Sequence, residues 1–354
     1  MLRLISLLIL VSVPVHASLP CAIALLDAQT GAVLGYEVRS FKGRPFDKVS
    51  AIIAENGMVY AKERGHMEVY EINPRKPWER KVVTAVFEDG LLYVENGQLT
   101  TMTEHLRIET HAFYPPGAGL DKRPELTDYW QVAYGNLSSR HMQRIGYVHG
   151  ENPRAAFLYK EARKQRILIY QKDGQGSRKL LDVPLPQDVS DLKSGVSPAL
   201  TTAYVAQHSK ELVAHHINGG TILAPLAMPA DYSGSNTITV SKDFSVVVGT
   251  SVIQDPLGAP TASQPVDQWT SMVSAAFSPD SRILAFYNQK TVAIEFYDIA
   301  RKVLRARVPL EGVGHVRKIL FSPQGTNAVV IAKTGGHGSL WILDLKAIGV
   351  RGTP

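Results

Sequence analysis

The sequence predicts an all-β protein that folds as a single β-propeller, with seven blades and with the N-terminal strand closing the last blade. One repeat leads to this prediction. The segments 275–287 (AAFSPDSRILAFY) and 319–331 (ILFSPQGTNAVVI) share an apolar run, a Ser-Pro turn and a second apolar run, and Phe277 and Phe321 lie 44 residues apart. Self-similarity at about this period is typical of propeller blades, each of which is a four-stranded sheet.

A second repeat follows the first. The apolar runs IEFYDIARKVL (294–304) and SLWILDLKAIG (339–349) end in a turn after Asp298 and Asp344, which are 46 residues apart. The N-terminal segment IALLDAQTGAVL (23–34) has the same pattern. Between the turns, alternating and β-branched residues indicate strands rather than helices, as in 238–253.

The blade boundaries come from the starts of the inner strand pairs. These fall near Lys48, Val82, Trp130, Val196, Thr237, Met272 and Val316, which gives seven blades of about 48 residues. The N-terminal copy has no inner pair before it, and little chain follows Leu345. We therefore expect the N-terminal strand to complete the C-terminal blade, which removes free sheet edges. The alternative is an open β-sandwich or two β domains.

The N-terminus indicates export. Residues 1–17 combine one basic residue, a short apolar stretch and small residues before a cleavage point after Ala17, as in a secretory signal peptide. The apolar stretch is shorter than the ~20 residues of a membrane span, and Pro20 before Cys21 is unlike a lipoprotein signal. We expect a propeller domain over 18–354 that is periplasmic or secreted and not inserted in a membrane after cleavage.

The composition excludes several kinds of chemistry. One cysteine rules out an intrachain disulfide and a Cys-x-x-Cys-His haem attachment. Neither a Walker phosphate loop nor a Gly-x-Ser-x-Gly nucleophile turn is present. The excess of 38 Lys and Arg over 32 Asp and Glu favours an acidic partner but is too diffuse to indicate nucleic acid. We expect no cofactor and no catalytic residue.

Histidine is the best candidate metal ligand. His208, His215 and His216 lie close together in the sequence, and imidazole binds transition metals. Neighbouring residues on a strand point to opposite faces, so His215 and His216 are not expected to share an ion. We interpret all three as solvent-facing or turn residues and expect no metal site. Asp173, Asp255 and Asp298 are expected to hydrogen-bond the backbone of their turns.

The repeats FSPDSRILAF and EFYDIARKVL resemble the WD40-like and YVTN-type propeller repeats of bacterial exported proteins. The resemblance covers about 270–349 and 22–72. It departs from WD40 blades in that Leu26, Tyr297 and Leu343 stand where those blades carry Trp. The resemblance implies the fold, while function must come from a site, because propellers serve many activities.

Two long loops favour a protein-binding scaffold of the cell envelope, a subunit or accessory factor of a larger assembly. The loops 114–130 and 255–270 exceed ordinary connections, and each ends in a tryptophan, Trp130 or Trp269. Exposed tryptophans are good interface anchors. The alternative is that both fill the core between blades.

A basic patch and one glycine loop complete the candidate binding residues. Arg123, Arg163 and Lys164 could dock an acidic protein, or they could be ordinary solubilising charge. His337 lies in the glycine loop 333–339, as a ligand contact or a plain turn. The competing function is a small-molecule enzyme of the lactonase or quinoprotein-dehydrogenase-subunit type, with its site in the central channel.

Overall fold

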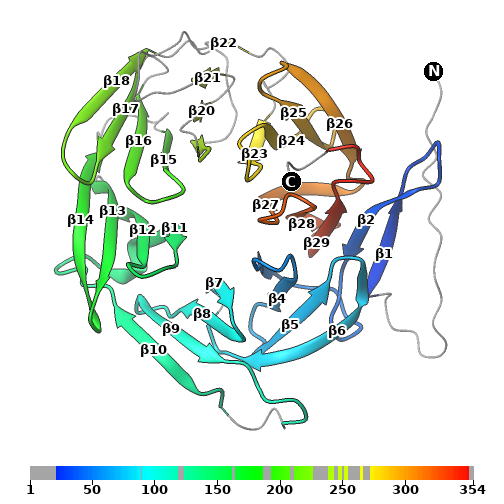
Figure 1. The fold of residues 1–354 in the computed structure, drawn as a ribbon, viewed down its shortest axis with the longest axis horizontal. Helices are drawn as coiled ribbons and strands as arrows, with labels where there is room; N and C mark the ends of the chain where they lie inside the picture. The colour runs from blue at the N-terminus through cyan, green and yellow to red at the C-terminus, as the bar shows by residue number, and fades with distance from the viewer. Residues whose placement is uncertain are drawn as a thin grey trace.

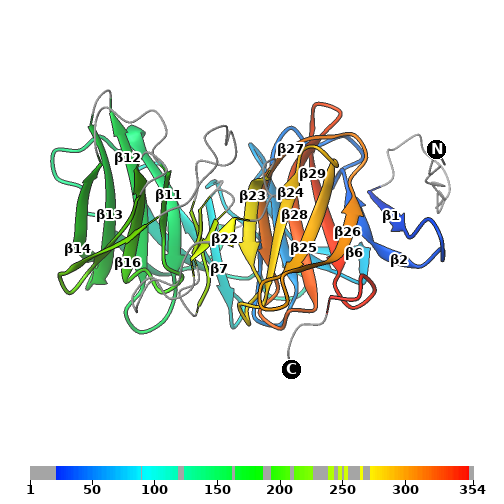
Figure 2. The same ribbon diagram turned by 90° about the horizontal axis from the view of Figure 1, so that it is seen from above.

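The strands form a ring of antiparallel sheets around a central axis (Figure 1), and Figure 2 shows this ring edge-on. The computed structural model describes residues 21–88, 90–118, 123–161, 164–185, 193–207, 211–225, 238–242, 246–248, 251–253, 264–265 and 272–350. Within these residues no helix is long and apolar enough to cross a membrane. The prediction of a single all-β propeller is confirmed.

The blades follow one another along the chain, each with its first strand innermost. The first two contain β3 (Val49–Ile53), β4 (Val59–Glu63), β5 (Glu68–Asn73) and β6 (Lys76–Ala85), then β7 (Gly90–Glu95), β8 (Gln98–Met102), β9 (Arg107–Ala112) and β10 (Leu126–Gln131). After the 3-10 turn η1 (Ser139–His141), the third contains β11 (Met142–Val148), β12 (Arg154–Glu161), β13 (Lys164–Asp173) and β14 (Gly176–Leu185). The fourth contains β15 (Lys193–Val196), β16 (Thr202–Gln207), β17 (Glu211–His216) and β18 (Thr221–Pro225).

The rest of the ring consists of one rudimentary sheet and two further blades. The sheet contains β19 (Thr239–Val240), β20 (Val246–Val248), β21 (Ser251–Ile253) and β22 (Gln264–Pro265). The next blade contains β23 (Met272–Phe277), β24 (Ile283–Asn288), β25 (Ala293–Asp298) and β26 (Val303–Pro309). The last contains β27 (Val313–Phe321), β28 (Asn327–Thr334) and β29 (His337–Asp344), with β1 (Ala22–Leu26) and β2 (Val33–Val38) added at its outer edge.

The number of regular blades differs from the sequence prediction. In the described part of the chain six sheets are full blades, whereas the sheet β19–β22 has strands of only two or three residues. The prediction of seven blades is therefore corrected to six, and the short sheet lies between the fourth blade and β23–β26.

Two boundaries were also wrong. Val82 lies in β6 and Trp130 in β10, both outermost strands of their blades, whereas the sequence analysis placed them at the start of inner strands. The cause is that outer and inner strands of a blade share the same alternation of apolar and polar residues. As a result, the segment 114–130 connects β9 to β10 and ends within β10, instead of joining two blades.

The ring closes through the N-terminal strand, as predicted. β2 pairs with β29 from Gly35 opposite Leu343 to Val38 opposite Leu340. A side-chain carbon at Gly35 would lie 2.2 Å from the carbonyl oxygen of Ile342, so only glycine permits this approach. Val38 is fully buried in the apolar cluster that joins the last blade to the first.

The crossing from the last blade to the first is fastened by backbone contacts. In the segment between β2 and β3, the Phe46 nitrogen donates to the Arg39 oxygen at 3.0 Å, and the Gly338 nitrogen donates to the Phe46 oxygen at 2.9 Å. The Phe46 side chain is fully buried in the same apolar cluster. One residue thus joins the closing strand, β29 and the first blade.

The repeated Ser-Pro turn is the hairpin between the first two strands of a blade. The Ser322 hydroxyl accepts hydrogen bonds from the backbone nitrogens of Thr326 and Asn327, both at 3.0 Å. The Ser278 hydroxyl accepts from the Ile283 nitrogen at 2.9 Å. A third copy, which the sequence analysis missed, has Ser197 accepting from Thr201 and Thr202 at 3.0 and 3.1 Å. The serine satisfies backbone donors of the turn that are buried or partly buried.

The same hairpins share a left-handed residue three positions after the serine. Leu200, Ser281 and Gly325 have φ values of 52°, 62° and 65°. Glycine takes this conformation without strain, whereas a side chain costs about 1–2 kcal/mol there. The buried hydroxyl contacts therefore hold two of the three hairpins in a conformation that their own residues disfavour.

Aspartate turns close several strand pairs, as expected. The Asp298 carboxylate accepts from the Arg301 nitrogen at 2.9 Å, and the Asp344 carboxylate accepts from the Lys346 nitrogen at 2.9 Å. Asp27 makes the same contact with the Thr30 nitrogen at 2.7 Å. Asp173 has no such bond among the described residues, and Asp255 lies outside them.

Replacing Gly35 with valine tests the closure. We expect Gly35→Val to lower the free energy of unfolding by about 3 kcal/mol or more, because the new side chain meets backbone that cannot move aside. Urea unfolding followed by tryptophan fluorescence measures this loss. The exposed Ala32, on the same hairpin, supplies the control Ala32→Val, which we expect to change stability by less than about 0.5 kcal/mol. Equal stability of the two variants would contradict the closure.

Removing the Ser322 hydroxyl tests the hairpin contact. Ser322→Ala leaves the partly buried nitrogens of Thr326 and Asn327 without their side-chain acceptor, which we expect to cost about 0.5–1.5 kcal/mol. In calorimetry this corresponds to a lower melting temperature by roughly 2–4 °C per kcal/mol. Gln324→Ala in the exposed part of the same turn is the control. A melting temperature unchanged by Ser322→Ala would show that the serine does not hold the hairpin.

Candidate binding site

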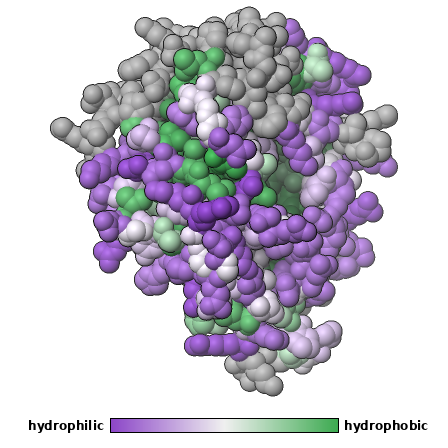
Figure 3. Space-filling view, turned by 60° about the vertical axis from the view of Figure 1, so that its left-hand side comes forward, coloured by the Kyte–Doolittle hydropathy of each residue, from purple (hydrophilic) through white to green (hydrophobic). Residues whose placement is uncertain are grey.

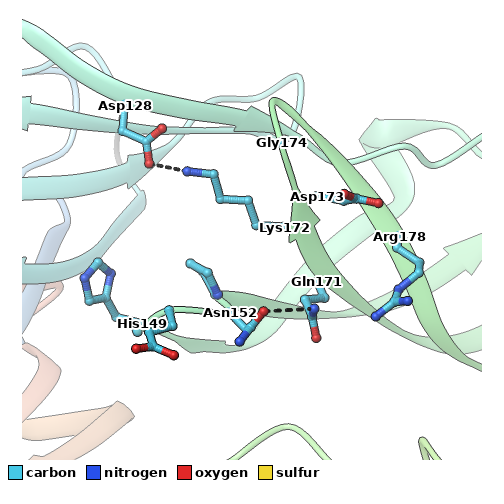
Figure 4. A pocket seen from close by; sticks show the side chains of 11 residues that line it. Asp128, His149, Asn152, Gln171, Lys172, Asp173, Gly174 and Arg178 are labelled. Carbon is cyan, nitrogen blue, oxygen red and sulfur yellow. Dashed lines mark hydrogen bonds and ion pairs between the residues drawn. The ribbon is translucent and has the colours of Figure 1, made fainter.

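A polar pocket of about 470 Å³ lies between the second and third blades. Its walls are Asp128 on β10, the β11–β12 turn and the β13–β14 turn with the adjoining strand residues. Figure 4 shows these side chains from close by. The lining residues are Asp128, His149, Gly150, Glu151, Asn152, Pro153, Gln171, Lys172, Asp173, Gly174 and Arg178.

The two blades are joined at the pocket by β10. The Lys172 ammonium forms an ion pair with the Asp128 carboxylate, as the dashed line in Figure 4 marks. Next to it, the Tyr129 hydroxyl donates to the Gln175 side-chain oxygen at 2.8 Å. The Ala133 nitrogen donates to the Ser177 hydroxyl at 2.7 Å. These contacts fix the β13–β14 turn against β10, so the pocket walls keep their relative positions.

His149 connects the pocket to the turns of the two preceding blades. Its ring stacks on Tyr93 with centroids 4.3 Å apart, and its Nε2 lies 3.3 Å from a Glu95 carboxylate oxygen. The Tyr93 hydroxyl donates to Glu55 at 3.0 Å. Burial, and after it the hydrogen bond to Glu55, raise the pKa of Tyr93 to about 12, so the hydroxyl keeps its proton at neutral pH.

The pocket offers both signs of charge. Asp128 and Lys172 neutralise each other, whereas Glu151, Asp173 and Arg178 have no ion-pair partner among the described residues. Asn152 and Gln171, which are hydrogen-bonded to each other at 3.4 Å, add an amide donor and acceptor. This set of groups suits the recognition of a polar segment that carries both a cation and an acceptor.

The binding residues proposed from sequence do not meet at this pocket. Trp130 is 2% exposed and packs in the core between the second and third blades, so it cannot anchor a partner and its alternative, core packing, is correct. Lys164 is exposed at the start of β13, and His337 is exposed at the start of β29. Arg123 is exposed in the β9–β10 connection. Arg163 and Trp269 lie outside the described residues.

The two described residues of the proposed basic patch, Arg123 and Lys164, lie on different blades. The Arg123 guanidinium lies 5.9 Å from the centre of the Phe87 ring, at the boundary of the first and second blades. Lys164 instead is the first residue of β13 in the third blade. Arg163 lies outside the described residues, so the basic patch stays a prediction.

Sequence reasoning recognised one turn of the pocket but not the pocket. Asp173 was expected to lie in a turn, and it is the last residue of β13, at the β13–β14 hairpin. The contact between Asp128 and Lys172 joins residues 44 positions apart on different blades. Only a correct assignment of β10 as an outer strand could have brought these two residues together.

Three further residues could hold a cation. Ligand atoms of Glu88, Glu109 and His111 lie within 4.8 Å of one another, although the sequence analysis expected no metal site. A Glu-x-His pair on one strand was the available signal, since alternate residues share a face. However, Arg107 Nε lies 3.0 Å from Glu109, and His111 Nε2 lies 3.2 Å from the same carboxylate. These contacts already neutralise Glu109 in part.

Among the described residues, His215 and His216 are not part of a possible metal-binding cluster. The His216 Nδ1 atom lies 3.1 Å from the Thr202 hydroxyl, and the His215 Nδ1 atom lies 3.4 Å from the Thr221 hydroxyl. Burial lowers the pKa of His215, which favours its neutral form. His208 lies outside the described residues.

No family model and no curated relative matches the chain. Solved structures of similar shape do match it. A virginiamycin B lyase from Staphylococcus aureus has a TM-score of 0.54 at 12% identity, over 87% of this chain and 98% of that one. A streptogramin B lyase has a TM-score of 0.51 at 12% identity, over 84% and 94%.

A protein of another kind has a similar shape. Hsv2 from K. marxianus has a TM-score of 0.51 at 10% identity, over 81% of this chain and 89% of that one. At such low identity, similarity extends to the fold alone, and one fold supports unrelated functions. The chain is therefore a β-propeller with the overall shape of these proteins.

Proposed function

We propose that the protein is a non-catalytic recognition propeller, which docks a partner protein through the pocket between its second and third blades. The observation that carries this proposal is the charge pattern of the pocket. The pocket contains two carboxylates, Glu151 and Asp173, and one guanidinium, Arg178, that can form ion pairs with a partner. The ion pair between Asp128 and Lys172 holds the pocket walls in place. Polar groups on a rigid scaffold are well suited to recognition.

The surface near these blades supports a polar contact. Figure 3, in which the left-hand side of Figure 1 comes forward, shows hydrophilic side chains over most of the described surface, with hydrophobic ones gathered near its middle. A partner that binds here would supply a polar segment with a Lys or Arg for the free carboxylates. The acidic partner expected from the overall basic charge remains a proposal for other parts of the surface.

The competing enzyme proposal receives less support. A metal-dependent lactonase would need carboxylates or histidines around the axis of the ring. Two of the described residues on innermost strands are instead the cations Arg144 on β11 and Lys318 on β27. Like charges repel, so these side chains oppose the binding of a divalent cation at the centre.

Export remains part of the proposal. We propose that residues 1–17 are removed as a signal peptide, so that the propeller acts in the periplasm or outside the cell. The resemblance of the repeats to those of bacterial exported proteins supports this view. N-terminal sequencing of the protein from its native host should then begin at Ser18.

Charge reversal in the pocket tests the docking proposal. The double variant Glu151→Lys with Asp173→Lys should reduce partner capture from native extract at least tenfold, as expected for two central contacts. Quantitative mass spectrometry of the captured proteins gives the measurement. The control Glu79→Lys with Glu104→Lys reverses two exposed charges outside the pocket lining and should retain capture. Partners held equally by both double variants would place docking elsewhere.

A further inference from the structure

Two cations from distant blades lie on innermost strands of the ring. Arg144 belongs to β11 of the third blade and Lys318 to β27 of the last blade, both innermost strands. Figure 1 shows β11 and β27 on opposite sides of the centre. The two side chains are nevertheless close enough that the charge of Arg144 acts on Lys318.

A β-bulge in β27 determines the direction in which the Lys318 side chain points. The register of β27 against β28 shifts between Val316 and Lys318, so Arg317 is an extra residue. Val316 and Ile319 therefore both pack in the cluster between the last two blades, although residues three apart on a regular strand face opposite ways. Lys318 consequently points away from that cluster. Bulges commonly re-aim a side chain in this manner.

Arg144 is directed by a second bulge. The register of β11 against β12 shifts between Arg144 and Gly146. A side-chain carbon at Gly146 would lie 2.7 Å from the Leu200 side chain, so packing against the fourth blade favours glycine here. The Arg144 Nη1 donates to the Leu91 carbonyl oxygen on β7 at 3.1 Å. This bond holds the guanidinium at the inner edge of the second blade and leaves its other N–H groups available.

The charge of this pair is not balanced. Desolvation by the neighbouring strands, and after it the repulsion by Arg144, lower the pKa of Lys318 to about 8, although part of this side chain stays in contact with solvent. Burial lowers the pKa of Arg144 to about 10. Neither side chain has a carboxylate partner among the described residues. Lys318 is also exposed to solvent, so a small solute can reach it. A cation pair without a counter-charge disfavours its own charged state unless an anion joins it.

We propose that Arg144 and Lys318 form a binding site for a small oxyanion, one that carries a carboxylate or a phosphate group, at the centre of the ring. The guanidinium presents a planar fork that matches two oxygens of such a group. The ammonium adds a point charge from the opposite side of the axis. This site is separate from the pocket between the second and third blades and does not depend on the proposed docking function.

Calorimetric titration and thermal melting at pH 7 test the proposal. The probes are inorganic phosphate and succinate, and sodium chloride of matched ionic strength corrects for screening. For the unmodified protein we expect saturable heat with at least one probe and a melting temperature that rises with its concentration. The probe that binds more tightly distinguishes a phosphate ligand from a carboxylate ligand.

The variant Lys318→Met supplies the decisive comparison. It removes the repulsion, so we expect a melting temperature equal to or above that of the unmodified protein, together with at least tenfold weaker binding. Lys346→Met, at an exposed lysine after β29, should bind as the unmodified protein does. A second variant, Arg144→Met, should also bind the probes more weakly. If it fails to fold, Lys318→Met still decides the outcome. Unchanged affinity in Lys318→Met, or stabilisation by chloride equal to that by both probes, would overturn the proposal.

Discussion

The pairing of β2 with β29 is the contact on which the rest of the ring depends. A propeller sheet packs only against its two neighbours, so an open ring would leave the apolar faces of its first and last blades uncovered. Here the segment from Gly35 to Val38 supplies the outer strand that the last blade lacks. The carbonyl of Ile342 lies where a side chain at Gly35 would be, which makes this approach specific to glycine.

Closure also determines which residues can act together. The pocket walls come from neighbouring blades, and local contacts such as the one between Asp128 and Lys172 suffice to assemble them. Arg144 and Lys318, by contrast, come from innermost strands of the third and the last blade, which a closed ring brings around one axis. The two sites therefore depend differently on the integrity of the ring.

The sequence predicted what each blade repeats locally. The Ser-Pro hairpins at Ser278 and Ser322 and the turns at Asp27, Asp298 and Asp344 have the same chemistry in each copy, because the side-chain oxygen accepts from backbone nitrogens of its own turn. Closure by the N-terminal strand followed from chain connectivity alone. Alternation of apolar residues, however, does not distinguish an inner from an outer strand, so Val82 and Trp130 were placed on the wrong strands.

The candidate sites were less accessible to sequence reasoning, because they combine residues that are far apart in the chain. Asp128 forms an ion pair with Lys172 of the neighbouring blade. The direction of the Lys318 side chain depends on a β-bulge at Arg317, which no local sequence pattern predicts. Trp130 is of a residue type that often anchors interfaces, but it is buried like a core residue. Single side chains with suggestive chemistry were therefore weaker guides than the repeats.

Hydrogen exchange followed by mass spectrometry tests the central claim most directly. If β2 closes the ring, the backbone amides of Tyr36 to Val38 should open only when the whole protein unfolds, and their protection should equal that of β28 and β29. Under native conditions peptides from these three strands would then exchange together. A β2 peptide that exchanges orders of magnitude faster than β28 and β29, while those strands stay protected, would contradict the account.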